Sequence, residues 1–152
     1  MCVDLARLSD SGEISKLLER AAAVLNASGI VVWMASENRA ELFPAASAGY
    51  DDRLLSRVGS IPRDASNLTA AAFRDGGSRT SPSSDSQQAA LAVPLVTPDG
   101  PVGVLSAELK AVQQVDGSRL AVATIFAAQL SMLLGSMTVA PPGEVSQTVQ
   151  TR

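Results

Sequence analysis

The feature of this sequence that most limits its fold is a β-hairpin built around a four-residue turn. Residues 97–100 read Thr-Pro-Asp-Gly, with proline and glycine where a tight turn needs their backbone angles. The apolar run Ala89–Val96 precedes this turn, and Pro101–Leu109 returns after it. Gly103, inside the returning strand, allows a neighbouring element to approach closely. The chain must therefore contain an antiparallel sheet.

A second hairpin is predicted nearer the start of the chain. Ile30–Ala35 is a continuous apolar run rich in β-branched residues, which is typical of a strand covered on both faces. Ser36–Ala40 is polar and turn-like, and Glu41–Ser47 can return as an antiparallel partner. Pro44 lacks a backbone N–H, so it implies an edge position or a bulge in that strand.

Two long helices are predicted at the ends of the sequence. The first begins with the capping-box spacing of Asp10 and Glu13, and we expect it to end at Gly29 in a left-handed cap. The last runs from Asp116 to about Gly135 and is apolar on more than one face. One of its faces can lie on the sheet. The other needs a partner, for which a second copy of the helix is the simplest candidate.

Between the hairpins the sequence predicts a mixed crossover. Residues 49–65 include a short helix that Pro62 would end, and residues 67–74 form a second short helix capped by Ser66 or Asn67. Ser78–Pro82 is predicted as a short strand, followed by a polar loop over residues 83–88.

Composition excludes several function classes. The 152 residues include no histidine and a single cysteine, Cys2, so the commonest general base and the usual metal ligands are missing. The net charge is −3 and the arginines are scattered among acids, which disfavours nucleic acid and anionic membrane surfaces. The longest apolar run, Ala121–Ala128, is too short to span a bilayer. We therefore expect a soluble, cytoplasmic protein that is not an enzyme, binds no nucleic acid and does not insert into a membrane.

A ligand site is predicted from polar groups that flank the middle of the sequence and from two aromatic residues near them. Specific pockets combine apolar walls with a few polar groups. The alternative is that the polar residues are ordinary loop residues and the aromatic ones fill the core. The candidates are Trp33, Asn67, Phe73, Ser81, Asp85 and Gln88.

Several stretches, in their order and spacing, resemble the GAF domain family. The sharpest is Ala-Val-Pro-Leu at 92–95, followed after the turn by Val-Gly-Val-Leu-Ser-Ala at 102–107. The other matching stretches are Ile14–Ala21, Gly29–Met34, residues 68–80 and Asp116–Leu134. The resemblance covers residues 3 to 135. PAS domains, which have a similar sheet, are the alternative fold.

The resemblance implies an α+β fold, an α/β sandwich. A central antiparallel sheet of five to six strands would carry the N- and C-terminal helices on one face. Short helices and loops would lie on the other face, with a small-molecule pocket. It also implies a homodimer through the terminal helices, for which the candidate contact residues are Leu17, Leu120, Phe126, Leu130 and Leu134.

This sequence departs from the family at known functional motifs. It lacks an Asn-Lys-Phe-Asp-Glu stretch, which argues against cyclic-nucleotide signalling, and no cysteine or histidine near the pocket could hold a bilin covalently. Members that reduce methionine sulfoxide use pocket cysteines, and Cys2 is badly placed for that role. No cofactor is identifiable, and an unidentified small molecule is the expected ligand.

The expected organisation is the end of an upstream linker helix at residues 1–9, a GAF-like domain at 10–136 and a disordered tail or linker at 137–152. The output domain would then lie in a longer parent chain. The sequence favours a regulatory, ligand-sensing module of a signal-transduction protein. The alternative is a dimerisation or scaffold module with a filled pocket.

Overall fold

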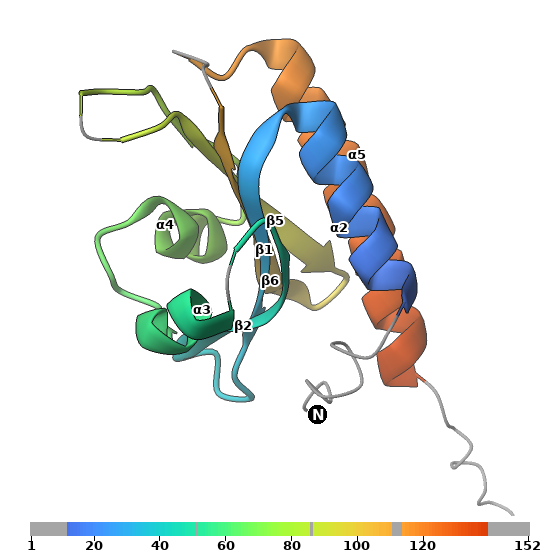
Figure 1. The fold of residues 1–152 in the computed structure, drawn as a ribbon. Coiled ribbons are helices and arrows are strands. Elements are labelled where there is room, and N and C mark those ends of the chain that lie inside the picture. Colours follow the sequence, from blue (N-terminus) through green and yellow to red (C-terminus); the bar gives the residue numbers. More distant parts are fainter. Residues whose placement is uncertain (1–11, 51, 86, 111–113, 140–152) are drawn as a thin grey trace, which may run out of the picture.

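Two β-hairpins join into one six-stranded antiparallel sheet in the computed structural model, which describes residues 12–50, 52–85, 87–110 and 114–139 (Figure 1). The strand order across the sheet is β3-β2-β1-β6-β5-β4. The strands are β1 Ala27–Ala35, β2 Glu41–Ala48, β3 Ile61–Pro62, β4 Arg79–Ser81, β5 Ala90–Thr97 and β6 Gly100–Leu109. The helices are α2 Gly12–Leu25, α3 Asp52–Val58, α4 Leu68–Asp75 and α5 Gly117–Val139.

The central pairing of β1 with β6 unites the hairpins. It runs antiparallel from Ala27 opposite Leu109 to Met34 opposite Gly103. A Cβ atom at position 103 would collide with the Trp33 carbonyl oxygen, which confirms that this glycine permits the close approach of a neighbouring strand. Pro44 pairs with Trp33 at a register shift in β1–β2, so the predicted bulge is also present.

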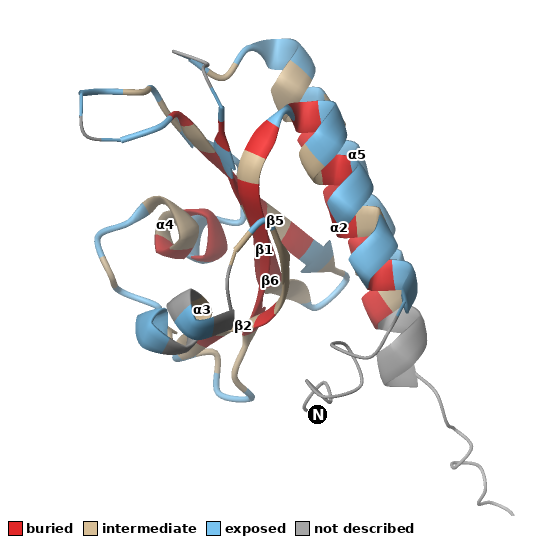
Figure 2. Ribbon diagram, in the orientation of Figure 1, coloured by how far each residue is buried: buried red, intermediate tan, exposed pale blue. Residues whose placement is uncertain are grey.

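The two long helices cover one face of the sheet, and α3 and α4 lie on the other (Figure 1). α2 and α5 run antiparallel to each other, and their inward sides are buried (Figure 2). The helix-face core is the large apolar cluster between these helices and the sheet, and it includes Ile14, Leu18, Leu25, Ile30, Val32, Leu91, Val93, Leu105, Phe126 and Leu130. This arrangement confirms the predicted sandwich.

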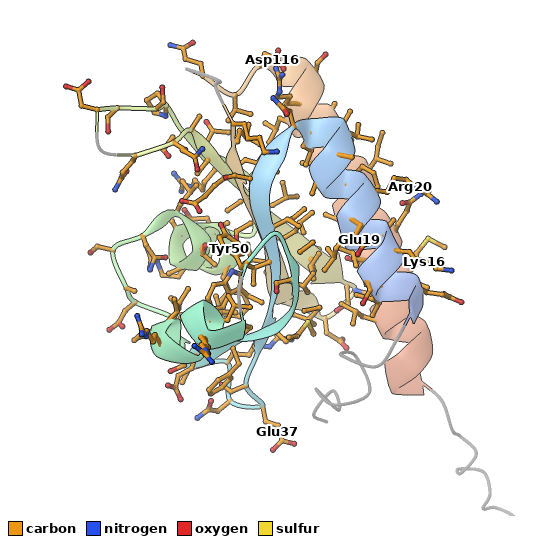
Figure 3. All side chains as sticks on the ribbon, viewed as in Figure 1. Lys16, Glu19, Arg20, Glu37, Tyr50 and Asp116 are labelled. Atoms are coloured by element: carbon orange, nitrogen blue, oxygen red, sulfur yellow. The ribbon has the colours of Figure 1, made fainter. Side chains whose placement is uncertain are left out.

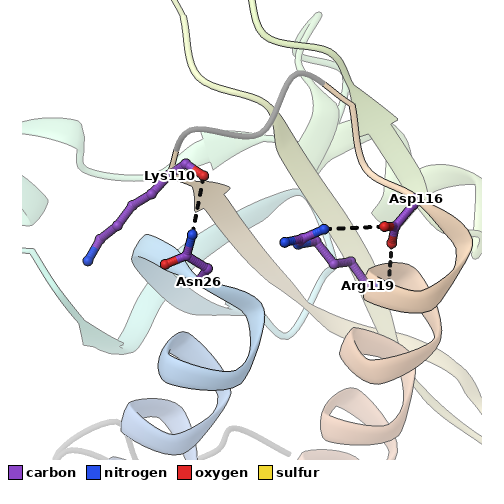
Figure 4. Close-up of polar contacts among 4 residues, drawn as sticks. All are labelled: Asn26, Lys110, Asp116 and Arg119. Atoms are coloured by element: carbon purple, nitrogen blue, oxygen red, sulfur yellow. Dashed lines mark hydrogen bonds and ion pairs between the residues drawn. The ribbon is translucent and has the colours of Figure 1, made fainter.

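The end of α2 differs from the prediction. Asn26, not Gly29, takes the left-handed conformation, with φ 56°. Asparagine tolerates this region better than most residues, and Gly29 is instead part of β1. The Lys110 N–H donates to the Asn26 carbonyl at 2.8 Å. The Asn26 side-chain amide donates in return to the Lys110 carbonyl at 3.5 Å (Figure 4), so the α2–β1 junction is bonded to the end of β6.

The bounds of the other helices agree with the sequence only in part. α4 is capped by Asn67 as expected, and the Asp116 carboxylate accepts from the Arg119 N–H at the start of α5 (Figure 4). Pro62 does not end α3, which stops at Val58 before Gly59 with φ 64°. Pro62 lies in β3 instead.

At its C-terminal end, α5 continues to Val139, so residues 137–139 are helical rather than part of a tail. The predicted segments 1–9 and 140–152 lie outside the described residues. Within α5, the stretch Gly117–Leu134 has a mean hydropathy of 1.4 and is long and apolar enough, by length and composition only, to cross a membrane. This stretch is longer than the apolar run Ala121–Ala128, on which the sequence-based argument against a membrane span rested. Core helices of soluble proteins pass the same test.

Candidate functional site

The sheet face under α4 carries a small apolar cluster beside a group of polar side chains. The apolar cluster brings together residues from β1, β2, α4, β5 and β6. Its buried members are Val31, Trp33, Leu42, Ala72, Phe73, Ala92 and Val104. Trp33 and Phe73, two of the predicted ligand residues, therefore belong to the same cluster.

Trp33 is fixed in this cluster by a hydrogen bond. Its side chain is only 5% exposed, and its Nε1–H donates to the Ser106 hydroxyl at 2.9 Å. Because a buried indole N–H without a partner is costly, Ser106 satisfies the polar end of the ring.

The segment between β3 and α4 covers the ring of Phe73. It is 4% exposed, and the Arg63 guanidinium lies 5.9 Å from its ring centroid. The Arg74 guanidinium donates to the carbonyls of Arg63 and Ala65 at 2.8 and 2.9 Å, which ties this segment to α4. Trp33 and Phe73 are thus core side chains with closed surroundings.

The polar group, which we call the Glu108 cluster, consists of Ser28, Tyr50, Gln88 and Glu108. The Tyr50 hydroxyl donates to Glu108 Oε1, and the Ser28 hydroxyl donates to Gln88 Oε1 at 2.8 Å. The Ser28 hydroxyl also lies 3.2 Å from the Glu108 carbonyl oxygen. Side chains from the β2–α3 connection and the β4–β5 loop are thereby held to residues of β1 and β6.

Gly29 makes room for this arrangement. A Cβ atom at position 29 would overlap the Tyr50 ring, so the ring lies directly against the β1 backbone. Figure 3 places Tyr50 on the α4 side of the sheet. Burial raises the pKa of Tyr50 above its usual range, and the hydrogen bond to Glu108 and that carboxylate's negative charge raise it further. Tyr50 therefore remains a neutral hydrogen-bond donor across the physiological pH range.

The remaining predicted ligand residues divide into two groups. Ser81 lies opposite Ala90, which lies opposite Glu108, and Gln88 belongs to the Glu108 cluster itself. Asn67 instead serves the backbone, because its Oδ1 accepts from the Ala70 N–H at 2.8 Å. Asp85 lies at a separate, shallow hollow of about 620 Å³, which is lined by Pro82, Ser83, Ser84, Asp85 and Gln114.

Sequence reasoning missed Ser28, Tyr50, Ser106 and Glu108. A signal for the last two was present, because positions 106 and 108 are polar alternate residues of an otherwise apolar strand. Tyr50 carried no local signal, since its partner is 58 residues away in the sequence.

The residues predicted for a dimer contact are mostly in the core of the single chain. Phe126, Leu130 and Leu134 are buried in the helix-face core, and Leu17 and Leu120 pack against it. A charge at position 126 or 130 would therefore disrupt folding before it tested association. The surface of α5 opposite the core bears a different set of residues, which we call the α5 stripe: Ala121, Ile125, Ala128 and Met132.

The described residues contain no group of three or more histidine, cysteine, aspartate or glutamate side chains placed to hold a metal ion. The Glu108 cluster offers a ligand hydrogen bonds and one negative charge, supplied by a carboxylate, a phenol, a hydroxyl and an amide.

Comparison with known proteins gives a family match and a consistent fold. The model of the GAF domain family matches residues 13–134. A search of curated proteins gave no match. Solved structures of similar fold are below 25% identical to this chain, so they bear on the fold alone.

The GAF domain of an Acinetobacter phosphoenolpyruvate-protein phosphotransferase is 16% identical with a TM-score of 0.74, over 89% of this chain and 92% of its own. The second GAF domain of DevS from Mycobacterium smegmatis is 23% identical with a TM-score of 0.69, over 89% and 96%. A free methionine-R-sulfoxide reductase from Neisseria meningitidis, in complex with its substrate, is 15% identical with a TM-score of 0.72, over 90% and 87%.

Proposed function

Because this chain belongs to the GAF domain family, we propose that it is a regulatory module of a signalling protein that binds a small molecule on its α4 face. In this proposal it is cytoplasmic, has no catalytic activity and forms a homodimer through α5. Its output would pass to a further domain of a longer parent chain.

The Glu108 cluster is the observation that carries the ligand proposal. Two chain segments, one with Tyr50 and one with Gln88, are each held to the sheet by a hydrogen bond to an exposed or half-buried polar group. A ligand that competes for these bonds would change the anchoring of both segments. Such a ligand shifts a conformational equilibrium only if it binds one arrangement better than the other.

The α5 stripe supports the dimer. Its four residues are spaced by four, three and four positions, which is the spacing of a helix–helix seam. Ile125 and Met132 are 59% and 76% exposed, and Ala121 and Ala128 between them permit close approach of a second helix. We therefore move the predicted contact from Phe126 and Leu130 to the opposite side of α5.

Trp33, the only tryptophan, provides a direct test of ligand binding, because it lies on the α4 face. Freshly purified protein would be analysed by native mass spectrometry, and any retained molecule would be added back to ligand-free protein while Trp33 fluorescence is followed. Binding should weaken in Glu108→Gln and remain unchanged in Glu19→Gln, which alters an exposed carboxylate on α2. Equal binding by both variants contradicts the proposed site.

Sedimentation velocity tests the dimer. The wild type should sediment as a dimer, and Ile125→Glu or Met132→Glu should give a folded monomer. Gln129→Glu adds the same charge beside the stripe and should disturb the dimer less. A wild type that is monomeric at all accessible concentrations contradicts this part of the proposal.

A scaffold module without a ligand is the second candidate. The close burial of Trp33 and Phe73 favours it, because the apolar part of the face is filled by the chain's own side chains. This candidate predicts that no small molecule changes Trp33 fluorescence while the dimer remains intact.

A further inference from the structure

Both hydroxyl hydrogens of the Glu108 cluster are already used within the cluster. The Tyr50 hydroxyl uses its hydrogen on Glu108 Oε1, and the Ser28 hydroxyl has only one hydrogen, which is directed to Gln88. The Trp33 N–H, on the same sheet face, is committed to Ser106. Groups that can accept remain, above all the second Glu108 oxygen and the Tyr50 oxygen. Of the four residues in the cluster, Gln88 keeps its amide N–H groups to donate.

Of the four side chains in the Glu108 cluster, only Glu108 is charged. Glu108 is exposed at the end of β6, and the phenol bonded to it stays neutral. Arg79 lies on the same face two strands away, opposite Ala92, and it is ion-paired with Asp75. Lys110 follows two residues along the chain from Glu108 and is the nearest cation in sequence. A ligand would have to compete with it.

Resting on the proposed ligand-binding function, we propose that Glu108 recognises a cationic hydrogen-bond donor, a protonated amine or amidine group of a small molecule. The ligand's hydrogens would bond to the free carboxylate oxygen and the Tyr50 oxygen. An anionic ligand would be repelled by the negative charge of Glu108 at the same place. Charge-assisted hydrogen bonds of this type are stronger than neutral ones, so the carboxylate selects the class of ligand.

The proposal also explains how occupancy could reach the rest of the fold. A cation held by the free Glu108 oxygen and the Tyr50 oxygen would change the strength of the Tyr50–Glu108 hydrogen bond, and Tyr50 lies two residues before the start of α3. Glu108 is two residues from Lys110, whose N–H holds the end of α2 through Asn26. The site is therefore close in sequence to the junction of α2 and β1.

Three probes of equal shape and different charge test the proposal: benzamidine, benzamide and benzoate. Each would be titrated at millimolar concentrations into ¹⁵N-labelled protein, with the amide signals of Ser28, Gln88 and Glu108 as the readout. Benzamidine should shift these signals at the lowest concentration and benzoate at the highest. Glu108→Gln should weaken benzamidine binding by roughly three- to tenfold, and Lys110→Gln should strengthen it. Glu19→Gln should leave it unchanged.

The outcomes separate this inference from the function on which it rests. If benzoate or benzamide shifts the cluster signals as readily as benzamidine, the charge preference is wrong while the ligand face remains. The same conclusion follows if Glu108→Gln leaves benzamidine binding unchanged. If no probe of any charge shifts these signals, both the inference and the proposed ligand face are contradicted.

Discussion

The two faces of the sheet are built on different principles. On the face under α2 and α5, twenty buried residues of the described chain form one cluster, and all are apolar. On the face under α4 the corresponding cluster has seven buried residues and borders four polar side chains that bond to one another. Since apolar burial is the main driving force of folding, the helix face supplies most of the stability. The α4 face can therefore carry polar groups at its edge.

The largest effect should come from the helix face. Leu130→Ala removes a fully buried side chain and should lower the free energy of unfolding by about 2–5 kcal/mol in urea denaturation. Gln129→Ala on the same helix, at an exposed position outside the α5 stripe, should change it by less than about 0.5 kcal/mol. Similar effects of the two substitutions would show that α5 does not bury the side predicted here.

A smaller loss is expected at Gly29, where the α4 face meets the sheet backbone. Gly29→Ala would push the Tyr50 ring away from β1, at a cost of about 1–3 kcal/mol, and break its bond to Glu108. Gly77→Ala is the control, because no atom lies within 4 Å of a Cβ built there. Equal stability of the two variants in urea would contradict the close packing of Tyr50 on Gly29.

Ser106→Ala tests the polar support of the aromatic cluster. It leaves the buried Trp33 N–H without its partner and should cost about 1–2 kcal/mol, with a shift of Trp33 fluorescence. Ser131→Ala, which removes a hydroxyl bonded to a carbonyl within α5, should have a smaller effect. An unchanged emission spectrum in Ser106→Ala would mean that this hydrogen bond does not fix the indole.

The smallest effect at neutral pH is expected for Glu108→Gln, within about 1 kcal/mol because the site is exposed. The difference should emerge at high pH. Tyr50 is the only tyrosine, so its ultraviolet absorbance reports its ionisation alone. Since Glu108 contributes to raising the pKa of Tyr50, the variant should titrate at lower pH than the wild type. Burial remains, so its pKa should stay above the ordinary value of about 10.

The raised pKa of Tyr50 also makes the stability of the wild-type protein depend on pH. Above pH 10 the unfolded chain releases the Tyr50 proton while the folded chain keeps it, so wild-type stability falls as pH rises through this range. The fall should be smaller in Glu108→Gln, because the folded and unfolded pKa values are closer. A wild-type Tyr50 that titrates at its ordinary pKa would contradict the hydrogen-bonded arrangement.

Sequence patterns predicted those parts of the fold that local chemistry specifies. The turn at 97–100, the bulge at Pro44 and the Asn67 cap each depend on a few adjacent residues, and each was correct. The end of α2 was assigned to Gly29 because glycine is the usual left-handed cap. That residue was needed elsewhere, since the Tyr50 ring occupies the space beside it.

The site and the outer surface of α5 depended on information that no local pattern contains. Tyr50 meets Glu108 because its ring lies against Gly29, which the pairing of β1 with β6 sets opposite Glu108. Trp33 and Phe73 belong to one buried cluster, but the partners of each, Ser106 and Arg63, could not be read from the sequence. On α5, apolar residues surround the helix, so periodicity could not tell Phe126, which packs on the sheet, from Ile125, which does not.

The antiparallel arrangement of α2 and α5 has a mechanical consequence. The last residue of α5 and the first of α2 lie at one pole of the molecule, and the Asn26–Lys110 junction lies at the other (Figure 1). A helix as long as α5 extends about 35 Å, so a tilt of about 5° at the junction would displace its far end by roughly 3 Å. The helix pair would act as a lever arm that magnifies a slight rearrangement at one pole into a larger one at the other.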